Sequence, residues 1–154
     1  MTRRLAFALT AIAAFALPAA AVPNFSGKWK MDASKSDFGP MPAPTVFNRT
    51  VTHEDPSMEV ATTQSGRQGE ATTTLKYTTD GKESVNTIRG AEVKSIAKWD
   101  GAVLVVSYKR ETPQGDIAVE ERWSMSEDGK TTTINSKISG SFGDFEIKTV
   151  LDKQ

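Results

Sequence analysis

The chain has 154 residues, with 19 basic and 19 acidic side chains and no cysteine. The absence of cysteine excludes disulfide bonds and a cysteine-linked lipid anchor, so the folded part must be stable through its core alone. No basic stripe is visible along the chain, which argues against nucleic acid and anionic membrane surfaces as main partners.

The first 21 residues have the pattern of a cleaved secretory signal peptide. Two arginines precede an apolar run from Leu5 to Leu17, Pro18 ends that run, and small residues follow up to Ala21. The run is shorter than the roughly 20 residues that a spanning helix needs, so we expect no membrane span. Cleavage after Ala21 leaves residues 22–154 as one monomeric domain, periplasmic or secreted, with 17 − 19 = −2 charges once the two arginines are removed.

The predicted domain begins with the segment from Asn24 to Asp32, in which apolar and polar residues alternate. A period of two predicts a strand with one buried face. The following residues 33–44 contain three prolines and Gly39. They predict an irregular crossing segment with one helical turn near residues 33–35.

Turn residues at hairpin spacing divide the rest of the chain into short segments rich in β-branched residues. Asp-Gly pairs begin at Asp80, Asp100 and Asp128, and such pairs favour tight turns because the central positions of a type I′ turn need positive φ. The predicted strands are 45–53, 58–64, 71–77, 83–89, 92–99, 103–111, 117–125, 131–138 and 144–151. Closure removes exposed sheet edges, so the meander favours an all-β, antiparallel up-and-down barrel of about 8–10 strands. A two-sheet sandwich is the alternative.

The stretch Phe25-Ser26-Gly27-Lys28-Trp29-Lys30 resembles the first-strand signature of the calycin superfamily, the lipocalins and fatty-acid-binding proteins. This resemblance implies that Gly27 and Trp29 form a structural plug at one end of the barrel. It also implies a cation over the indole, for which Arg122 and Lys148 are the candidates. The wider pattern resembles small secreted bacterial lipocalin-like proteins of unassigned function.

The chain departs from the calycin pattern in three places. The proline-rich crossing segment is not expected to form the helix-turn-helix lid of fatty-acid-binding proteins. No C-terminal helix follows the last predicted strand, and the Arg-x-Tyr pair of the fatty-acid site is missing. The resemblance therefore implies a fold without naming a ligand.

Alternation along the predicted strands places several polar side chains on the inner face. A buried charge is costly unless it is paired, so such residues pair, reach the barrel mouth or contact a ligand. The candidate ligand-binding residues are Arg49, Tyr77, Tyr108, Arg110 and Glu121.

Two of these candidates lie two residues apart on one predicted strand. Tyr108 and Arg110 could hold a ligand carboxylate through a charge-assisted hydrogen bond. In the alternative interpretation, Arg110 pairs with Glu121 across neighbouring strands. The facing of strands 83–89 and 92–99 is ambiguous, although we expect Val93, Ala97 and Trp99 to turn inward.

Catalysis has little support in the sequence. His53 is the only histidine, and beside the Asp55-Pro56 turn we expect it at the surface, without companions for a metal. No Gly-x-Ser-x-Gly elbow occurs, so we expect no enzyme, no metal and no cofactor. The main hypothesis is a barrel that binds a small hydrophobic or amphipathic molecule in its lumen. The alternative is a non-enzymatic interaction or structural protein of the cell envelope with a filled barrel, and a cavity of roughly 300 Å³ or more would favour binding.

Overall fold

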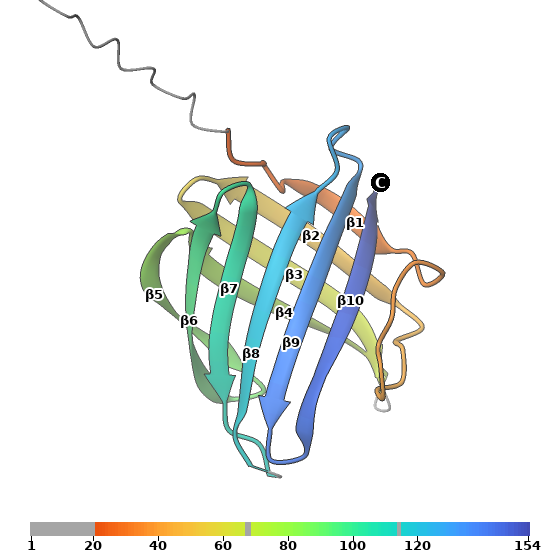
Figure 1. Ribbon diagram of the computed structural model, residues 1–154, viewed down its shortest axis with the longest axis vertical. Coiled ribbons are helices and arrows are strands. Elements are labelled where there is room, and N and C mark those ends of the chain that lie inside the picture. The colour runs from red at the N-terminus through yellow and green to blue at the C-terminus, as the bar shows by residue number, and fades with distance from the viewer. Residues whose placement is uncertain (1–20, 67–68, 114) are drawn as a thin grey trace, which may run out of the picture.

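The computed structural model describes residues 21–154 apart from 67–68 and 114. These described residues form ten antiparallel strands and no helix (Figure 1). The predicted signal peptide lies almost wholly outside the described residues. The strands are β1 (Gly27–Met31), β2 (Phe47–Glu54), β3 (Ser57–Gly66), β4 (Gly69–Thr78), β5 (Asp80–Ile88), β6 (Ala91–Asp100), β7 (Val103–Arg110), β8 (Ile117–Met125), β9 (Thr131–Gly140) and β10 (Gly143–Lys153).

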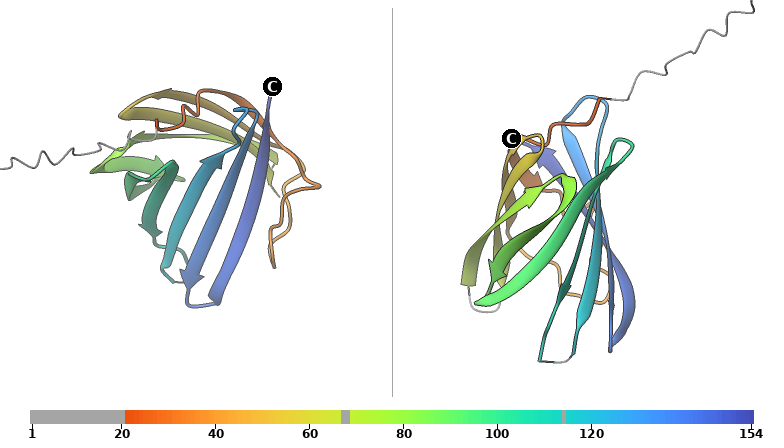
Figure 2. Two further views of the ribbon diagram at one scale, coloured as in Figure 1. Left: turned by 45° about the horizontal axis from the view of Figure 1, so that its top comes forward. Right: turned by 90° about the vertical axis from the view of Figure 1, so that its left-hand side faces the viewer.

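The strands form one sheet in the order β4-β3-β2-β1-β10-β9-β8-β7-β6-β5. Every pair of hydrogen-bonded neighbours is consecutive in sequence except β1 and β10, the first and last strands. The sheet curls until β4 and β5 lie side by side, which gives a nearly closed barrel (Figure 2). The predicted up-and-down barrel is confirmed, and the sandwich alternative is wrong.

Side chains close the seam between β4 and β5, where no backbone ladder forms. The Asn86 side chain accepts a hydrogen bond from the Lys76 amide at 2.7 Å and donates one to the Lys76 carbonyl at 2.9 Å. One step along the seam, the Ser84 hydroxyl accepts from the Thr78 amide at 3.0 Å. Backbone groups that are taken out of water need partners. At this part-buried seam the side chains supply the bonds that a neighbouring strand supplies elsewhere.

The strand registers turn the apolar side of each strand toward the interior of the barrel. The core includes Phe25, Trp29, Val60, Leu104, Trp123, Ile134 and Leu151, all with at most 2% of their surface exposed. Val93 and Ala97 are buried, as predicted for the ambiguous strand β6. On β5 the inward position is Asn86, whereas its neighbour Val85 is exposed.

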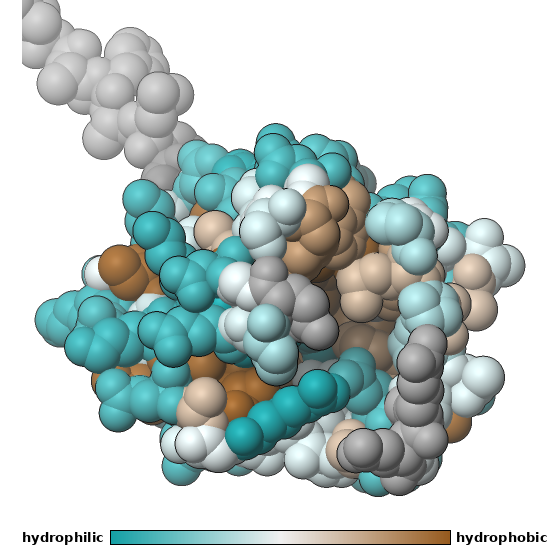
Figure 3. All heavy atoms as spheres, turned by 90° about the horizontal axis from the view of Figure 1, so that it is seen from below, coloured by the Kyte–Doolittle hydropathy of each residue, from teal (hydrophilic) through white to brown (hydrophobic). Residues whose placement is uncertain are grey.

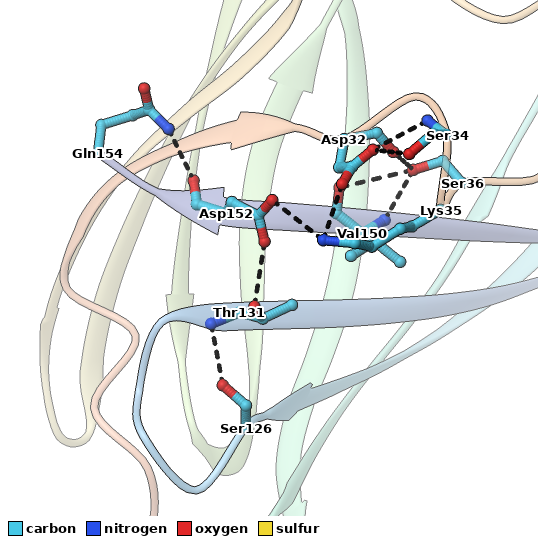
Figure 4. Close-up of polar contacts among 9 residues, drawn as sticks. All are labelled: Asp32, Ser34, Lys35, Ser36, Ser126, Thr131, Val150, Asp152 and Gln154. Carbon is cyan, nitrogen blue, oxygen red and sulfur yellow. Dashed lines mark hydrogen bonds and ion pairs between the residues drawn. The ribbon is translucent and has the colours of Figure 1, made fainter.

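The crossing segment between β1 and β2 contains a hydrogen-bonded turn at residues 33–35 in place of the predicted helical turn. Lys35 lies between the carboxylates of Asp32 (2.8 Å) and Asp152 (3.5 Å), and Asp152 also accepts from the Thr131 hydroxyl (Figure 4). Asp37 then forms a β-bridge with Lys148 on β10. These contacts hold the segment against the edge of β10 beyond the end of β1.

Candidate ligand-binding site

The two ends of the barrel differ in construction. Both described termini lie at the upper end in Figure 1, where aromatic side chains fill the interior. At the lower end β3 meets β4, β5 meets β6, β7 meets β8 and β9 meets β10. Figure 3 views this lower end, where hydrophobic side chains are visible between hydrophilic ones at the rim. We call the lower end the mouth.

The first-strand tryptophan belongs to the plug at the upper end. Trp29 is 2% exposed, and its indole N–H donates to the Phe25 carbonyl at 2.9 Å. The cation over its ring is Lys153, with Nζ 5.3 Å from the ring centre, so the candidates Arg122 and Lys148 are wrong. The sequence signal pointed elsewhere because Lys153 follows the last predicted strand.

Gly27 makes this arrangement possible. Its φ of 141° is rare for other residues, and a Cβ there would lie 2.8 Å from Cε of Lys153. The glycine of the Gly-x-Trp signature therefore provides room for the lysine that covers Trp29.

His53 is a buried member of the plug, so its expected place at the surface is wrong. It is 5% exposed, and its ring stacks against Phe25 and Trp99 at centroid distances of 6.1 and 5.9 Å. Nδ1 accepts the Phe25 amide at 3.2 Å, and Nε2 faces Asp55 at 3.5 Å. His53 occupies an inward-facing position of β2, and this alternation along the strand determines its burial more than the nearby turn does.

The lower half of the barrel contains a partly open cavity of about 610 Å³. Strands β2, β3, β7, β8, β9 and β10 all contribute inward side chains to it, and the crossing segment covers one side. The lining includes Phe38, Met41, Phe47, Arg49, Gln64, Tyr108, Val119, Glu121, Ser136, Ile138, Ile147 and Thr149. We call this cavity the lumen.

The crossing segment contributes to the lumen without forming a helix. Residues 41–45 and Phe38 line it, and the β-bridge at Asp37 holds the segment against β10. The prediction that this segment forms no helical lid is confirmed for the described residues. Its covering role was missed, because the proline pattern predicts irregular backbone but not the surface on which that backbone lies.

Arg49 projects into the lumen with its guanidinium between two aromatic rings. Its central carbon lies 4.7 Å from the ring centre of Trp123 and 5.2 Å from that of Phe47. Nε donates to the Thr62 hydroxyl at 3.0 Å. Nη1 is buried and has no hydrogen-bond partner among the described residues. The guanidinium thus retains donor capacity inside the barrel.

Glu121 lines the same cavity from β8. Its Oε2 accepts the indole N–H of Trp123 at 2.8 Å. Burial raises the pKa of the Tyr108 hydroxyl far above its ordinary value, and the Glu121 carboxylate raises it further. Burial, and after it the Glu121 carboxylate, also raises the pKa of Tyr77, which is 7% exposed. Both phenols are therefore uncharged hydrogen-bonding groups.

Arg110 lies apart from the lumen. It faces Ile117 across the β7–β8 ladder and forms no ion pair with Glu121, so the paired alternative is wrong. Arg110 instead lines a second, open cavity of about 1090 Å³ outside β5–β9, and its Nε is buried without a partner among the described residues. Tyr108 lines both cavities. The structure therefore unites Arg49, Tyr108 and Glu121, and the joint role of Tyr108 and Arg110 in binding stays a prediction.

Two further features bear on the chemistry of the chain. Among residues 21–154, leaving aside 67–68 and 114, no group of three or more histidine, aspartate or glutamate side chains is placed to hold a metal ion. Within the same residues, the structure has no helix with the length and apolar character needed to cross a membrane.

Solved structures with the same architecture include known binding proteins. Zebrafish ileal bile acid-binding protein complexed with cholic acid matches with a TM-score of 0.60 and 19% identity, over 84% of this chain and 98% of that one. A secretory abundant heat soluble protein from Ramazzottius varieornatus matches with a TM-score of 0.61 and 13% identity, over 84% and 94%. A fatty acid-binding protein from Drosophila melanogaster brain matches with a TM-score of 0.54 and 20% identity, over 84% of this chain and 99% of that one. The chain has a calycin-like fold.

Comparisons of the sequence say less about function than the comparison of the fold does. No family model matches the chain. A stretch of 69 residues is 32% identical to glutathione reductase from Yarrowia lipolytica, covering 44% of this chain and 13% of that protein. Because the chain spans only about an eighth of that enzyme, the match carries no activity across. The bile-acid and fatty-acid proteins with the same fold are named for binding and not for catalysis.

Proposed function

We propose that this protein is an exported, periplasmic or secreted barrel that holds a small hydrophobic or amphipathic molecule in its lumen. The observation that carries the proposal is a cavity of about 610 Å³ whose wall combines apolar side chains with two charged ones, Arg49 and Glu121. Small-molecule sites usually measure roughly 300–1,000 Å³ and have a few polar groups in an apolar wall. The lumen has this composition and size.

The state of Arg49 supports an occupied lumen. A buried donor without a partner costs about 1–3 kcal/mol, more when the group is charged. Its neighbours Phe47 and Trp123 offer ring faces to the guanidinium but no acceptor in its plane. Nη1 itself is covered, so a ligand in the lumen reaches the guanidinium elsewhere. A ligand oxygen bound there offsets part of the cost of this charge, which couples ligand binding to the stability of the barrel.

The size of the lumen weighs against the alternative of a filled barrel that acts only through its outer surface. The cavity exceeds the roughly 300 Å³ that separates the two hypotheses. The bile-acid and fatty-acid neighbours in the fold comparison also support a binding role.

The plug supports export with cleavage after Ala21. Asn24, Phe25 and Ser26 all bond to His53, and Phe25 is fully buried, so the residues just after the proposed cleavage site belong to the folded domain. Intact mass and N-terminal sequencing of the protein from its own host test this part. We expect a chain that begins at Val22, whereas a retained leader contradicts the export proposal.

Binding in the lumen is tested with the uncharged fluorescent probe N-phenyl-1-naphthylamine. Ser136 lines the lumen, whereas the adjacent Asn135 is exposed on the same strand. We expect Ser136→Phe to weaken probe binding by about tenfold or more, which corresponds to about 1.4 kcal/mol. The matched variant Asn135→Phe should leave binding unchanged. Absence of probe binding to the wild-type protein, or equal effects of the two variants, rejects the lumen as the site.

A further inference from the structure

Two opposite charges face the lumen. Arg49 and Glu121 are the only charged side chains that line it among the described residues. Both contact Trp123, since the guanidinium lies over the indole ring and the carboxylate accepts the indole N–H. The two groups nevertheless form no ion pair with each other in the described part of the chain.

The remaining polar groups around this pair are uncharged. Tyr108, Gln64 and Ser136 line the same cavity, and the phenol of Tyr108 stays protonated because of its burial. The formal charges of the lining therefore cancel. The cavity presents donors at Arg49 and an acceptor at Glu121.

We propose that the lumen selects uncharged amphipathic molecules whose polar group both accepts a hydrogen bond from Arg49 and donates one to Glu121. This inference rests on the proposed binding function and names its ligand class. Primary amides and hydroxyl compounds with an apolar chain have the required chemistry. Such a molecule satisfies both charged groups at once.

Glu121 is the residue that sets this preference. A ligand carboxylate would gain Arg49 but would stand in the same partly open cavity as a second carboxylate, Glu121. Charges inside a protein are screened far less than exposed ones, so this repulsion is not removed by salt. An alkylammonium would bind Glu121 but would be repelled by the guanidinium of Arg49. A neutral group with a donor and an acceptor avoids both costs.

The test uses three probes with the same ten-carbon chain: decanamide, decanoate and decylammonium. Each displaces N-phenyl-1-naphthylamine from the wild-type protein, and the displacement constants are compared at neutral pH. We expect decanamide to bind about tenfold more tightly than either ion, a difference of about 1.4 kcal/mol. Amide and carboxylate have nearly the same shape, so the comparison changes the charge and the N–H donors while keeping the size of the ligand.

The variant Glu121→Gln removes the negative charge and retains an oxygen for the Trp123 indole. We expect it to bind decanoate at least as tightly as decanamide. The matched control is Glu120→Gln, because Glu120 is the adjacent residue and is exposed on the outer face. The control should keep the wild-type order of the three probes.

The outcomes separate this inference from the proposed function. Displacement of the fluorescent probe with equal constants for amide and carboxylate overturns the selectivity while leaving lumen binding intact. An unchanged order in Glu121→Gln overturns the role of that residue. If the fluorescent probe does not bind at all to the folded wild-type protein, both the binding function and its selectivity are overturned.

Discussion

The backbone N–H of Phe25 donates to Nδ1 of His53 at 3.2 Å inside the plug at the upper end of the barrel. Because Nδ1 accepts, the neutral ring carries its proton on Nε2, which faces Asp55 at 3.5 Å. The His53 backbone is bound as well, since Ser26 Oγ donates to its carbonyl at 3.0 Å. One histidine therefore anchors the segment that precedes the first strand.

Replacing His53 with Phe keeps a ring between Phe25 and Trp99 but removes the acceptor for the Phe25 amide. We expect the free energy of unfolding to fall by about 1–3 kcal/mol, the usual cost of leaving a buried donor unpaired. Urea denaturation followed by tryptophan fluorescence measures the change. The exposed neighbour gives the control Thr52→Val, for which the midpoint should stay the same. Equal midpoints for all three proteins would show that the hydrogen bond is dispensable.

Asp55 gives the plug a dependence on pH. Hydrogen bonds from the Thr79 hydroxyl and then the Trp99 indole lower the pKa of this carboxyl below its ordinary value, and His53 contributes in the same direction. A lowered pKa in the folded state stabilises the protein above the ordinary value of about 4, and this contribution is lost as the pH falls through the lowered one. Wild-type protein should therefore lose thermal stability below about pH 4.

The variant Asp55→Asn isolates this contribution. Its melting temperature should be lower than that of the wild type at neutral pH, and the difference should shrink from pH 5 toward pH 2. Asp144→Asn alters an exposed carboxylate at the mouth and serves as the control. A constant difference between wild type and Asp55→Asn across this range would contradict the assignment.

The fold was predictable because alternation and turn residues repeat through the whole chain. Ten period-two segments separated by Gly, Pro and Asp determine a meander, and inward parity then follows from the apolar side of each strand. Even Val93 and Ala97, on a segment of ambiguous pattern, turned inward as expected. Local patterns suffice for features that depend on neighbours along the chain.

The site was less predictable because its partners are distant in sequence. The alternation along the strands identifies Arg49, Tyr108 and Glu121 as inward polar residues. No spacing in the sequence indicates that Arg49 lies over Trp123 or that Arg110 lines the second cavity. Lys153 was missed for the same reason, since only the closure of β1 against β10 brings it over Trp29. Such pairings come from the curvature of the sheet, which residue patterns do not specify.

Asn86 holds the β4–β5 seam through two bonds to Lys76. Asn86→Leu keeps the number of side-chain heavy atoms and their branching but leaves the amide and carbonyl of Lys76 without partners in the described structure. We expect a loss of about 1–3 kcal/mol in the free energy of unfolding. Hydrogen exchange of the Lys76 amide should accelerate more than that of amides in the β2–β3 ladder, because the seam opens locally.

The exposed residue Asn135 supplies the control Asn135→Leu. It should leave both the stability and the Lys76 exchange rate unchanged. Uniform acceleration of exchange across the barrel in Asn86→Leu would show a global loss of stability and no local seam.

Arg49 should serve binding more than stability. Arg49→Met removes the bond to Thr62 and the stacking on Trp123, but it also removes a buried guanidinium with an unpartnered N–H. These effects oppose each other, so we expect the free energy of unfolding to change by less than about 1 kcal/mol. Decanamide should bind about 10- to 100-fold more weakly, because a hydrogen bond to a charged group contributes about 1.5–3 kcal/mol.

Arg122→Met is the matched control for Arg49→Met. Arg122 pairs with Asp100 at 2.6 Å on the outer face, and an exposed pair contributes about 0–1 kcal/mol. Its removal should leave decanamide affinity unchanged. The neutral fluorescent probe should bind Arg49→Met as well as it binds the wild type, since its binding depends on apolar contact. A large loss of stability in Arg49→Met with unchanged decanamide affinity would make Arg49 a structural residue and remove it from the site.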